Sequence, residues 1–132
     1  MNQESNVAAV LVGAALTRVE RLPHKYWVFH FGKNVRLNIE APWRLISKDS
    51  ILVTREDDGQ KFGLPAPVDA EAELRKRIEG HQVTAAATNR ATSDLTLQFD
   101  NSFTLEVFND SSGYECWTLN PEDGSVIVGR NE

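Results

Sequence analysis

The chain of 132 residues has few of the side chains that carry metal or redox chemistry: one cysteine, one methionine and three histidines. Cys116 cannot close an internal disulfide, and it has no cationic neighbour in sequence that would activate its thiol. The histidines, His24, His30 and His81, are scattered without zinc-binding spacing, and His30 is predicted to be an exposed neighbour of Arg36 across a hairpin. We therefore expect no metal, no cofactor and no covalent catalysis, and a buried or half-buried Cys116.

Long apolar runs and an excess of positive charge are also absent. The longest apolar run, residues 7–16, covers ten residues after Glu4, whereas a membrane-spanning helix needs about 20. Fourteen basic against nineteen acidic side chains give a net charge of −5, which opposes binding to the phosphates of nucleic acid. We expect a cytoplasmic protein with neither a membrane nor a nucleic acid as partner, and we expect any charged partner to be basic.

Catalytic signatures are missing as well. The sequence contains no Gly-x-Ser-x-Gly motif, no glycine-rich phosphate loop and no dinucleotide fingerprint. The sequence therefore favours a protein that is not an enzyme.

The most informative feature that is present is an internal repeat. A set of alternating apolar residues recurs 68 positions later, and a three-residue turn, 32–34 or 100–102, breaks each set at the same place. The sets are Trp27, Phe29, Phe31, Val35, Leu37 and Ile39, followed by Leu95, Leu97, Phe99, Phe103, Leu105 and Val107. Gly13-x-x-Leu16 likewise matches Gly80-x-x-Val83 at an offset of 67. The pattern indicates a duplicated architecture whose repeated apolar residues face a common core.

Strands are predicted in both halves, and a short helix introduces each half. The predicted strands cover residues 16–21, 26–31, 35–40, 43–46, 51–54, 82–87, 95–99, 103–108, 114–119 and 126–128. One helix is predicted over 6–12 with Ser5 as N-cap, and the other over 70–79 with Asp69 as N-cap and Gly80 as its stop. The predicted fold class is α+β, mostly antiparallel β, with two internally duplicated β-modules.

The chain is predicted to be a single domain over residues 1–132. Its two pseudo-repeats, about 5–60 and 68–130, are joined by a Gly/Pro connector at 62–67.

The candidate binding residues are carboxylates outside the predicted core and one aromatic side chain beside them. Residues 109–113 have no counterpart in the first half, and a loop that only one copy possesses is a plausible place for a function of its own. Tyr114 is expected to be exposed, because Trp117 matches the core position of Trp43. The predicted partner-binding residues are Glu56, Asp57, Asp58, Asp110, Tyr114 and Glu115.

Three short motifs carry a resemblance to a protein family. Residues 113–119 with their Tyr-Glu-x-Trp sequence, residues 37–42 and the Gly80-x-x-Val83 strand start resemble a group of small bacterial proteins of unknown function. Some small, acidic, duplicated β-rich domains of this kind are immunity proteins that neutralise a neighbouring toxin. The resemblance implies no catalytic residues and a basic toxin domain or nuclease as partner.

The sequence leaves three functions open. The first is a non-enzymatic protein-binding domain such as an immunity protein. The second is a small-ligand-binding or enzymatic domain with a pocket between the two modules. The third is a self-associating structural module, in which an unpaired sheet edge closes a homodimer.

Overall fold

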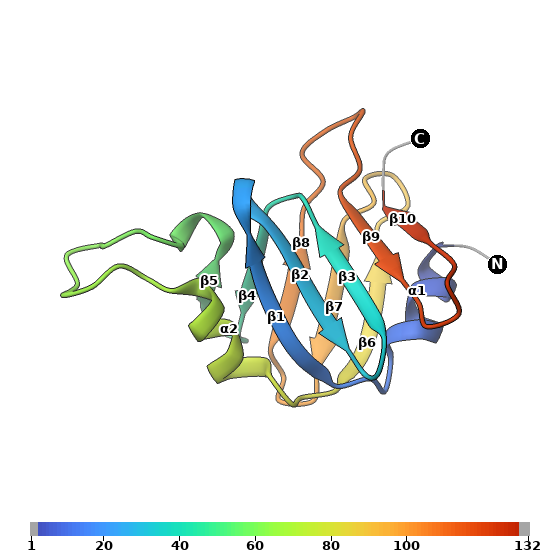
Figure 1. Cartoon of the computed structure of the whole chain (residues 1–132), viewed down its shortest axis with the longest axis horizontal. Coiled ribbons are helices and arrows are strands. Elements are labelled where there is room, and N and C mark those ends of the chain that lie inside the picture. Colours follow the sequence, from blue (N-terminus) through green and yellow to red (C-terminus); the bar gives the residue numbers. More distant parts are fainter. Residues whose placement is uncertain (1–2, 130–132) are drawn as a thin grey trace.

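The computed structural model describes residues 3–129, in which two five-stranded antiparallel sheets enclose two helices (Figure 1). The first half contains α1 (Gln3–Leu11), β1 (Leu16–Leu22), β2 (Tyr26–Phe31), β3 (Val35–Ile39), β4 (Trp43–Ile46) and β5 (Ile51–Thr54). The second half contains α2 (Ala70–Ile78), β6 (Val83–Thr88), β7 (Leu95–Phe99), β8 (Thr104–Val107), β9 (Trp117–Asn120) and β10 (Ile127–Gly129). Short 3-10 turns, η1 (Pro23–Lys25) and η2 (Arg55–Asp57), follow β1 and β5. The predicted fold class is confirmed.

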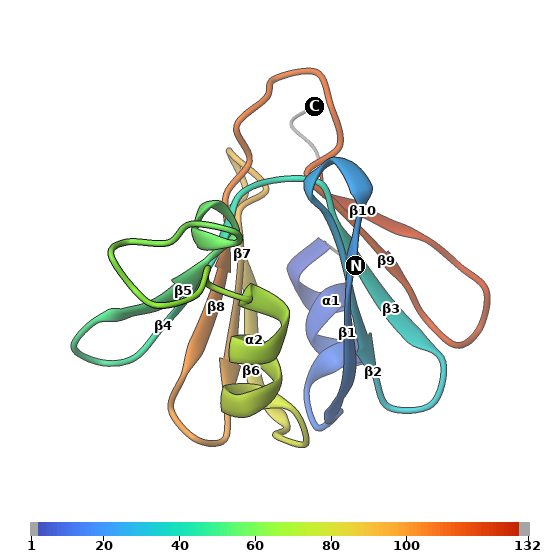
Figure 2. The ribbon, with the colours of Figure 1, turned by 60° about the vertical axis from the view of Figure 1, so that its left-hand side comes forward.

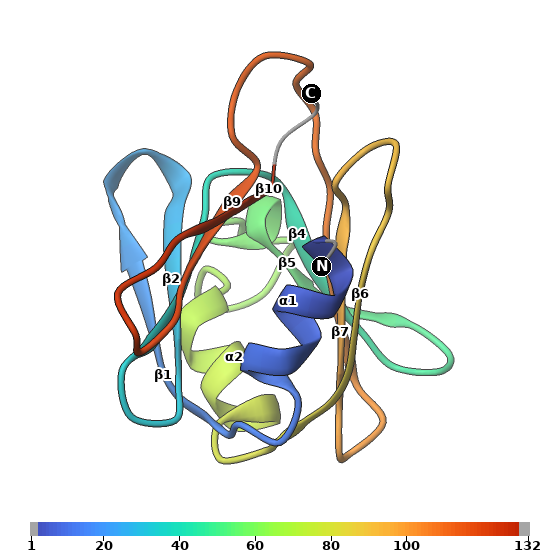
Figure 3. The ribbon, with the colours of Figure 1, turned by 90° about the vertical axis from the view of Figure 1, so that its right-hand side faces the viewer.

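The two halves exchange strands. One sheet has the order β1-β2-β3-β9-β10 and the other β5-β4-β8-β7-β6, so each sheet takes three strands from one half and two from the other. Figure 2 shows the sheets as two diverging layers that are joined where β3 passes to β4 and β8 to β9, with both helices between them. The view in Figure 3 shows the same two helices in the space between the sheets. The duplicated modules are therefore interlocked, not laid side by side as two separate sheets.

Backbone hydrogen bonds between the halves occur in equivalent pairs. The N–H of Gly13 donates to the carbonyl of Val83 at 2.8 Å, and the N–H of Gly80 donates to the carbonyl of Leu16 at 2.7 Å. The second bond is the first one shifted by the 67-residue offset of the sequence repeat. The start of each half is thus bonded to the start of the other in the same way.

The apolar residues of the repeat fill the space between the sheets. All of them are buried except Phe103, which is half-buried just before β8. Three aromatic rings meet edge to face at the centre, with Trp43 5.0 Å from Trp27 and 6.1 Å from Phe29 between ring centroids. Leu11 of α1 and Leu74 of α2 close the same core from the side on which the sheets diverge.

The helix boundaries confirm one N-cap and correct the other. The Asp69 carboxylate accepts the N–H of Ala72 at 3.1 Å, and α2 is followed by Gly80 with a φ of +87°, as predicted. The prediction of Ser5 as a cap for a helix over 6–12 is wrong, because α1 already includes residues 3–4. Gln and Glu are good helix formers, and the helix runs through the serine.

The strand predicted to begin at Tyr114 begins instead at Trp117. The Ser111 hydroxyl oxygen accepts the N–H groups of Gly113 and Tyr114 at 3.1 and 3.0 Å, which holds this segment in a turn. The expected alternation is also wrong, because Cys116 and Trp117 are both buried. The predicted burial of Cys116 is confirmed.

His30 is a further correction. It lies opposite Arg36 in the register of β2 and β3, as predicted, but it is half-buried and its ring bonds to Glu20 on the other neighbouring strand. The two atoms, His30 Nε2 and Glu20 Oε1, are 2.5 Å apart. The histidine's hydrogen bond lowers the pKa of Glu20, so a carboxylate on β1, not Arg36, is its partner.

Gly129 on β10 provides a sharp test of this packing. A Cβ atom at this position would lie 2.0 Å from Cε2 of Trp117. Gly129→Ala should therefore displace the indole and lower the free energy of unfolding by about 1–3 kcal/mol, measured by urea denaturation. Gly113→Ala is the matched control, because a Cβ there meets nothing within 4 Å. Equal stability of Gly129→Ala and the wild type would contradict the packing described.

Candidate functional site

Two crossovers carry the chain between the sheets, and they differ in length. The first consists of residues 40–42 and the second of residues 108–116. The N–H of Glu40 donates to the carbonyl of Cys116 at 3.1 Å, and the N–H of Phe108 donates to the carbonyl of Pro42 at 2.9 Å. The two crossovers are therefore bonded to each other at one end of the molecule, where the second forms the projecting loop in Figure 1.

Hydrogen bonds hold the longer crossover in a defined shape. The N–H of Asn109 donates to the Asp94 carboxylate at 2.7 Å, and its side-chain amide donates to the carbonyl of Thr92 at 2.8 Å. The Asn109 side-chain oxygen in turn accepts the N–H of Ser111 at 3.1 Å. These contacts tie the loop to the turn between β6 and β7.

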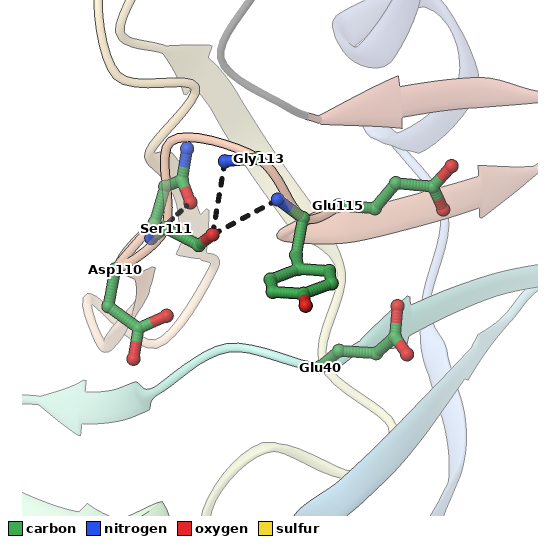
Figure 4. A pocket seen from close by; sticks show the side chains of 7 residues that line it. Glu40, Asp110, Ser111, Gly113 and Glu115 are labelled. Carbon is green, nitrogen blue, oxygen red and sulfur yellow. Dashed lines mark hydrogen bonds between the residues drawn. The ribbon is translucent and has the colours of Figure 1, made fainter.

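The longer crossover and Glu40 surround an open hollow of about 570 Å³. Glu40 comes from the end of β3, whereas Asp110, Tyr114 and Glu115 come from the loop. Figure 4 shows Glu40 and Glu115 on one side of the loop and Asp110 on the other. Tyr114 is 81% exposed, as the sequence predicted. Among residues 3–129, no lysine, arginine or histidine lines this hollow.

The glutamates of this region affect the pKa of the neighbouring Tyr26. Burial raises the pKa of the Tyr26 hydroxyl, and the charges of Glu40 and Glu115 raise it further against the opposing effect of Arg36. Glu40 and Glu115, far apart in sequence, therefore both lie near the Tyr26 hydroxyl. Sequence reasoning missed Glu40, whose only signal was its place at the end of a predicted strand, where the shorter crossover begins.

The other predicted carboxylates have roles within the fold. The Asp57 carboxylate accepts the N–H of Thr54 at 2.9 Å, while the Asp57 N–H donates back to the Thr54 hydroxyl, which makes a capping box. Asp58 accepts hydrogen bonds from Arg21 and from the N–H of Ala70, each at 2.9 Å. These contacts join η2 to β1 and to the start of α2.

Glu56 is paired with two cations. Its carboxylate accepts from Lys25 at 2.6 Å and from Arg55 at 2.8 Å. Arg55 also donates to the backbone carbonyl of Glu40 at 3.4 Å. Glu56 and Asp58 line a separate, smaller hollow, so the structure does not bring the two predicted acidic groups into one site.

No group of three histidine, cysteine, aspartate or glutamate residues within 3–129 is placed to hold a metal ion. No helix in the same range is long and apolar enough to cross a membrane.

Comparison with known proteins adds no relative. No protein-family model, no curated protein and no solved structure matches the chain.

Cys116, the last residue of the second crossover, is buried and should be unreactive. Burial, followed by the charges of Asp94 and Asp110, raises the pKa of its thiol to about 12, so about a thousandfold less thiolate is present at neutral pH than for a free cysteine. Labelling by a disulfide reagent at pH 7 should be slow in the folded protein and fast in denaturant, with Cys116→Ser as the blank. Fast labelling of the folded protein would contradict this placement.

Proposed function

We propose that the chain is a non-enzymatic protein-binding domain whose partner is a basic protein. The binding face is the acidic crossover surface, defined as Glu40, Asp110, Tyr114 and Glu115. In its most specific form, the proposal is that of an immunity protein that neutralises a basic toxin or nuclease.

The composition of the hollow is the observation that carries the proposal. Three carboxylates and an exposed tyrosine line it, and no cationic side chain within residues 3–129 joins them. Such a group attracts lysine and arginine side chains of a partner and repels phosphates. Tyr114 adds a large, rigid ring, the kind of residue that anchors interfaces.

The fixed shape of the loop supports binding in another way. Asn109 and Ser111 already hold the turn through side-chain hydrogen bonds to the backbone. A surface that is ordered before binding loses less conformational entropy on association. The loop is therefore suited to recognition of a folded partner.

The immunity function rests on charge and on the resemblance of residues 113–119 to small bacterial proteins. A net charge of −5 steers the chain toward basic partners over distances of about a Debye length. Toxic nucleases need a basic surface to bind nucleic acid. An acidic inhibitor that covers this surface competes directly with the substrate.

A second candidate function is favoured by the place of the hollow. It lies between the two halves, with Glu40 from the first and the other lining residues from the second, and its volume is within the usual range of ligand sites. A small organic cation such as a polyamine fits the same lining. Spermidine serves as the probe for this alternative.

Neutralising the loop carboxylates should slow association with the partner. For Asp110→Asn combined with Glu115→Gln, we expect a lower association rate constant at low salt, and a difference from wild type that shrinks as salt rises toward about 0.5 M. The measurement is surface plasmon resonance or stopped flow with a basic toxin or nuclease domain encoded next to this chain.

The matched control neutralises two exposed carboxylates at the opposite end of the strands. Asp49→Asn combined with Glu122→Gln changes the net charge equally but lies in the β4–β5 and β9–β10 turns. If both double variants lower the association rate constant equally, only net charge matters for binding. That result would contradict the assignment of the acidic crossover surface as the binding site. Tight binding of spermidine with no binding of the basic domain would favour the small-ligand function.

Tyr114 should slow the dissociation of the complex with the basic partner. Because its ring is exposed and makes no core contact, Tyr114→Ala should leave the free energy of unfolding unchanged. Because the substitution removes an interface anchor, Tyr114→Ala should raise the dissociation rate constant by about thirtyfold, equivalent to about 2 kcal/mol. Unchanged dissociation kinetics would remove Tyr114 from the interface.

A further inference from the structure

A second exposed feature lies outside the acidic crossover surface. Residues 60–67, here named the arm, connect η2 to α2 and project from the body of the molecule (Figure 1). Every residue of the arm is exposed, including Phe62 at 67% and Leu64 at 50%. The sequence predicted only a connector here, yet the arm displays two large apolar side chains to solvent.

The arm is a shaped element with a closed base. The N–H of Gly59 donates to the carbonyl of Val68, and the N–H of Val68 donates to the carbonyl of Gln60, both at 2.8 Å. Phe62 lies in a turn in which the N–H of Leu64 donates to the carbonyl of Lys61 at 2.7 Å. The φ of +47° at Phe62 is a strained conformation for a bulky residue. Strained backbone conformations cluster at ligand clamps and switch regions, so Phe62 is a candidate contact residue.

The chain also carries a hollow that matches the arm. An open hollow of about 820 Å³ lies on the outer face of β1, β2 and β3. Leu22 and Tyr26 supply accessible apolar surface to it, and the buried Val28 lies at its base. Glu40 and Arg36 are among its charged residues. Its volume accommodates a phenylalanine and a leucine side chain.

Charge complementarity selects the orientation. Lys61 is the only charged residue of the arm, and within residues 3–129 neither Lys61 nor Glu40 has an ion-pair partner. Insertion of Phe62 over the apolar floor would allow Lys61 to meet Glu40. Arg36 is also compatible with this arrangement, because a guanidinium group stacks favourably on an aromatic ring.

The arm and the hollow flank the same edge of the molecule. β1 is an edge strand of its sheet, and Leu22 on this strand borders the hollow. On the other side, the contact between Asp58 and Arg21 ties the base of the arm to β1. A second copy related by a two-fold axis beside β1 would receive this arm in its hollow while placing its own arm in the hollow of the first.

We propose that this chain forms a two-fold homodimer in which each arm docks into the hollow on the outer face of β1–β3 of the other copy. In the dimer, Phe62 and Leu64 of both copies are buried. Two-fold symmetry leaves no arm or hollow free to bind a third copy, so the assembly does not extend into a fibre. Glu40 belongs to both surfaces, but the dimer does not rest on the proposed function, because no other protein takes part.

Analytical ultracentrifugation of the full chain over about a hundredfold range of protein concentration tests the proposal. The wild type should pass from monomer to dimer, whereas Phe62→Ser combined with Leu64→Ser should stay monomeric with an unchanged circular dichroism spectrum. Val12→Ser combined with Val126→Ser is the matched control, since both valines are exposed elsewhere, and it should dimerise as the wild type does. A wild type that is monomeric throughout, or a dimer that survives loss of the arm's apolar residues, overturns the proposal.

A charge swap tests the specific contact. Lys61→Glu and Glu40→Lys should each weaken dimerisation about two- to fivefold at low salt, and the double variant should recover most of the loss. Mixing the arm variant with Leu22→Glu, which blocks the hollow, should give a heterodimer through the one intact arm and hollow. Failure of both the charge recovery and the mixed dimer overturns the docking described, whatever the outcome of the experiments with a basic partner.

Discussion

The exchange of strands at the two crossovers is the constraint on which the rest of the structure depends. The bonds from Glu40 to Cys116 and from Phe108 to Pro42 join the crossovers at the point where the halves change sheets. Because each sheet is completed by two strands of the other half, neither half has a full apolar face to bury alone. The two halves therefore share one core, to which both contribute buried residues.

The exchange also explains where a new surface arose. The strands and their buried residues are under packing constraints in both copies, but the length of a crossover is free as long as its ends stay bonded. The first crossover is limited to residues 40–42, whereas the second extends over 108–116 and carries Asp110, Tyr114 and Glu115. Since the crossovers lie together, the extension in one copy is brought beside Glu40 of the other. The candidate site thus results from the different lengths of two crossovers that are otherwise equivalent.

The parts of the fold that depend on local chemistry follow from the sequence. Alternation identified the buried face of Trp27 to Ile39, and the comparison of Trp117 with Trp43 correctly placed Tyr114 in solvent. Strand exchange was not predictable, because alternation tells which face is buried and not which strand lies beside it. Glu40 was missed because alternation also does not tell which loop lies beside it. The turn at Ser111 was missed because it depends on side-chain hydrogen bonds, which the apolar pattern does not reveal.

The two copies differ in the core as well as on the surface. Trp117 donates its indole N–H to the carbonyl of Ser93 at 2.8 Å, in a turn where Ser93 has a φ of +64°. The matching turn in the first half keeps a positive φ at Lys25, yet the indole N–H of the matching Trp43 has no hydrogen-bond partner among residues 3–129. A buried donor without a partner costs about 1–3 kcal/mol. The aromatic contacts of Trp43 with Trp27 and Phe29 must offset this cost, so the first copy depends on ring packing where the second depends on a hydrogen bond.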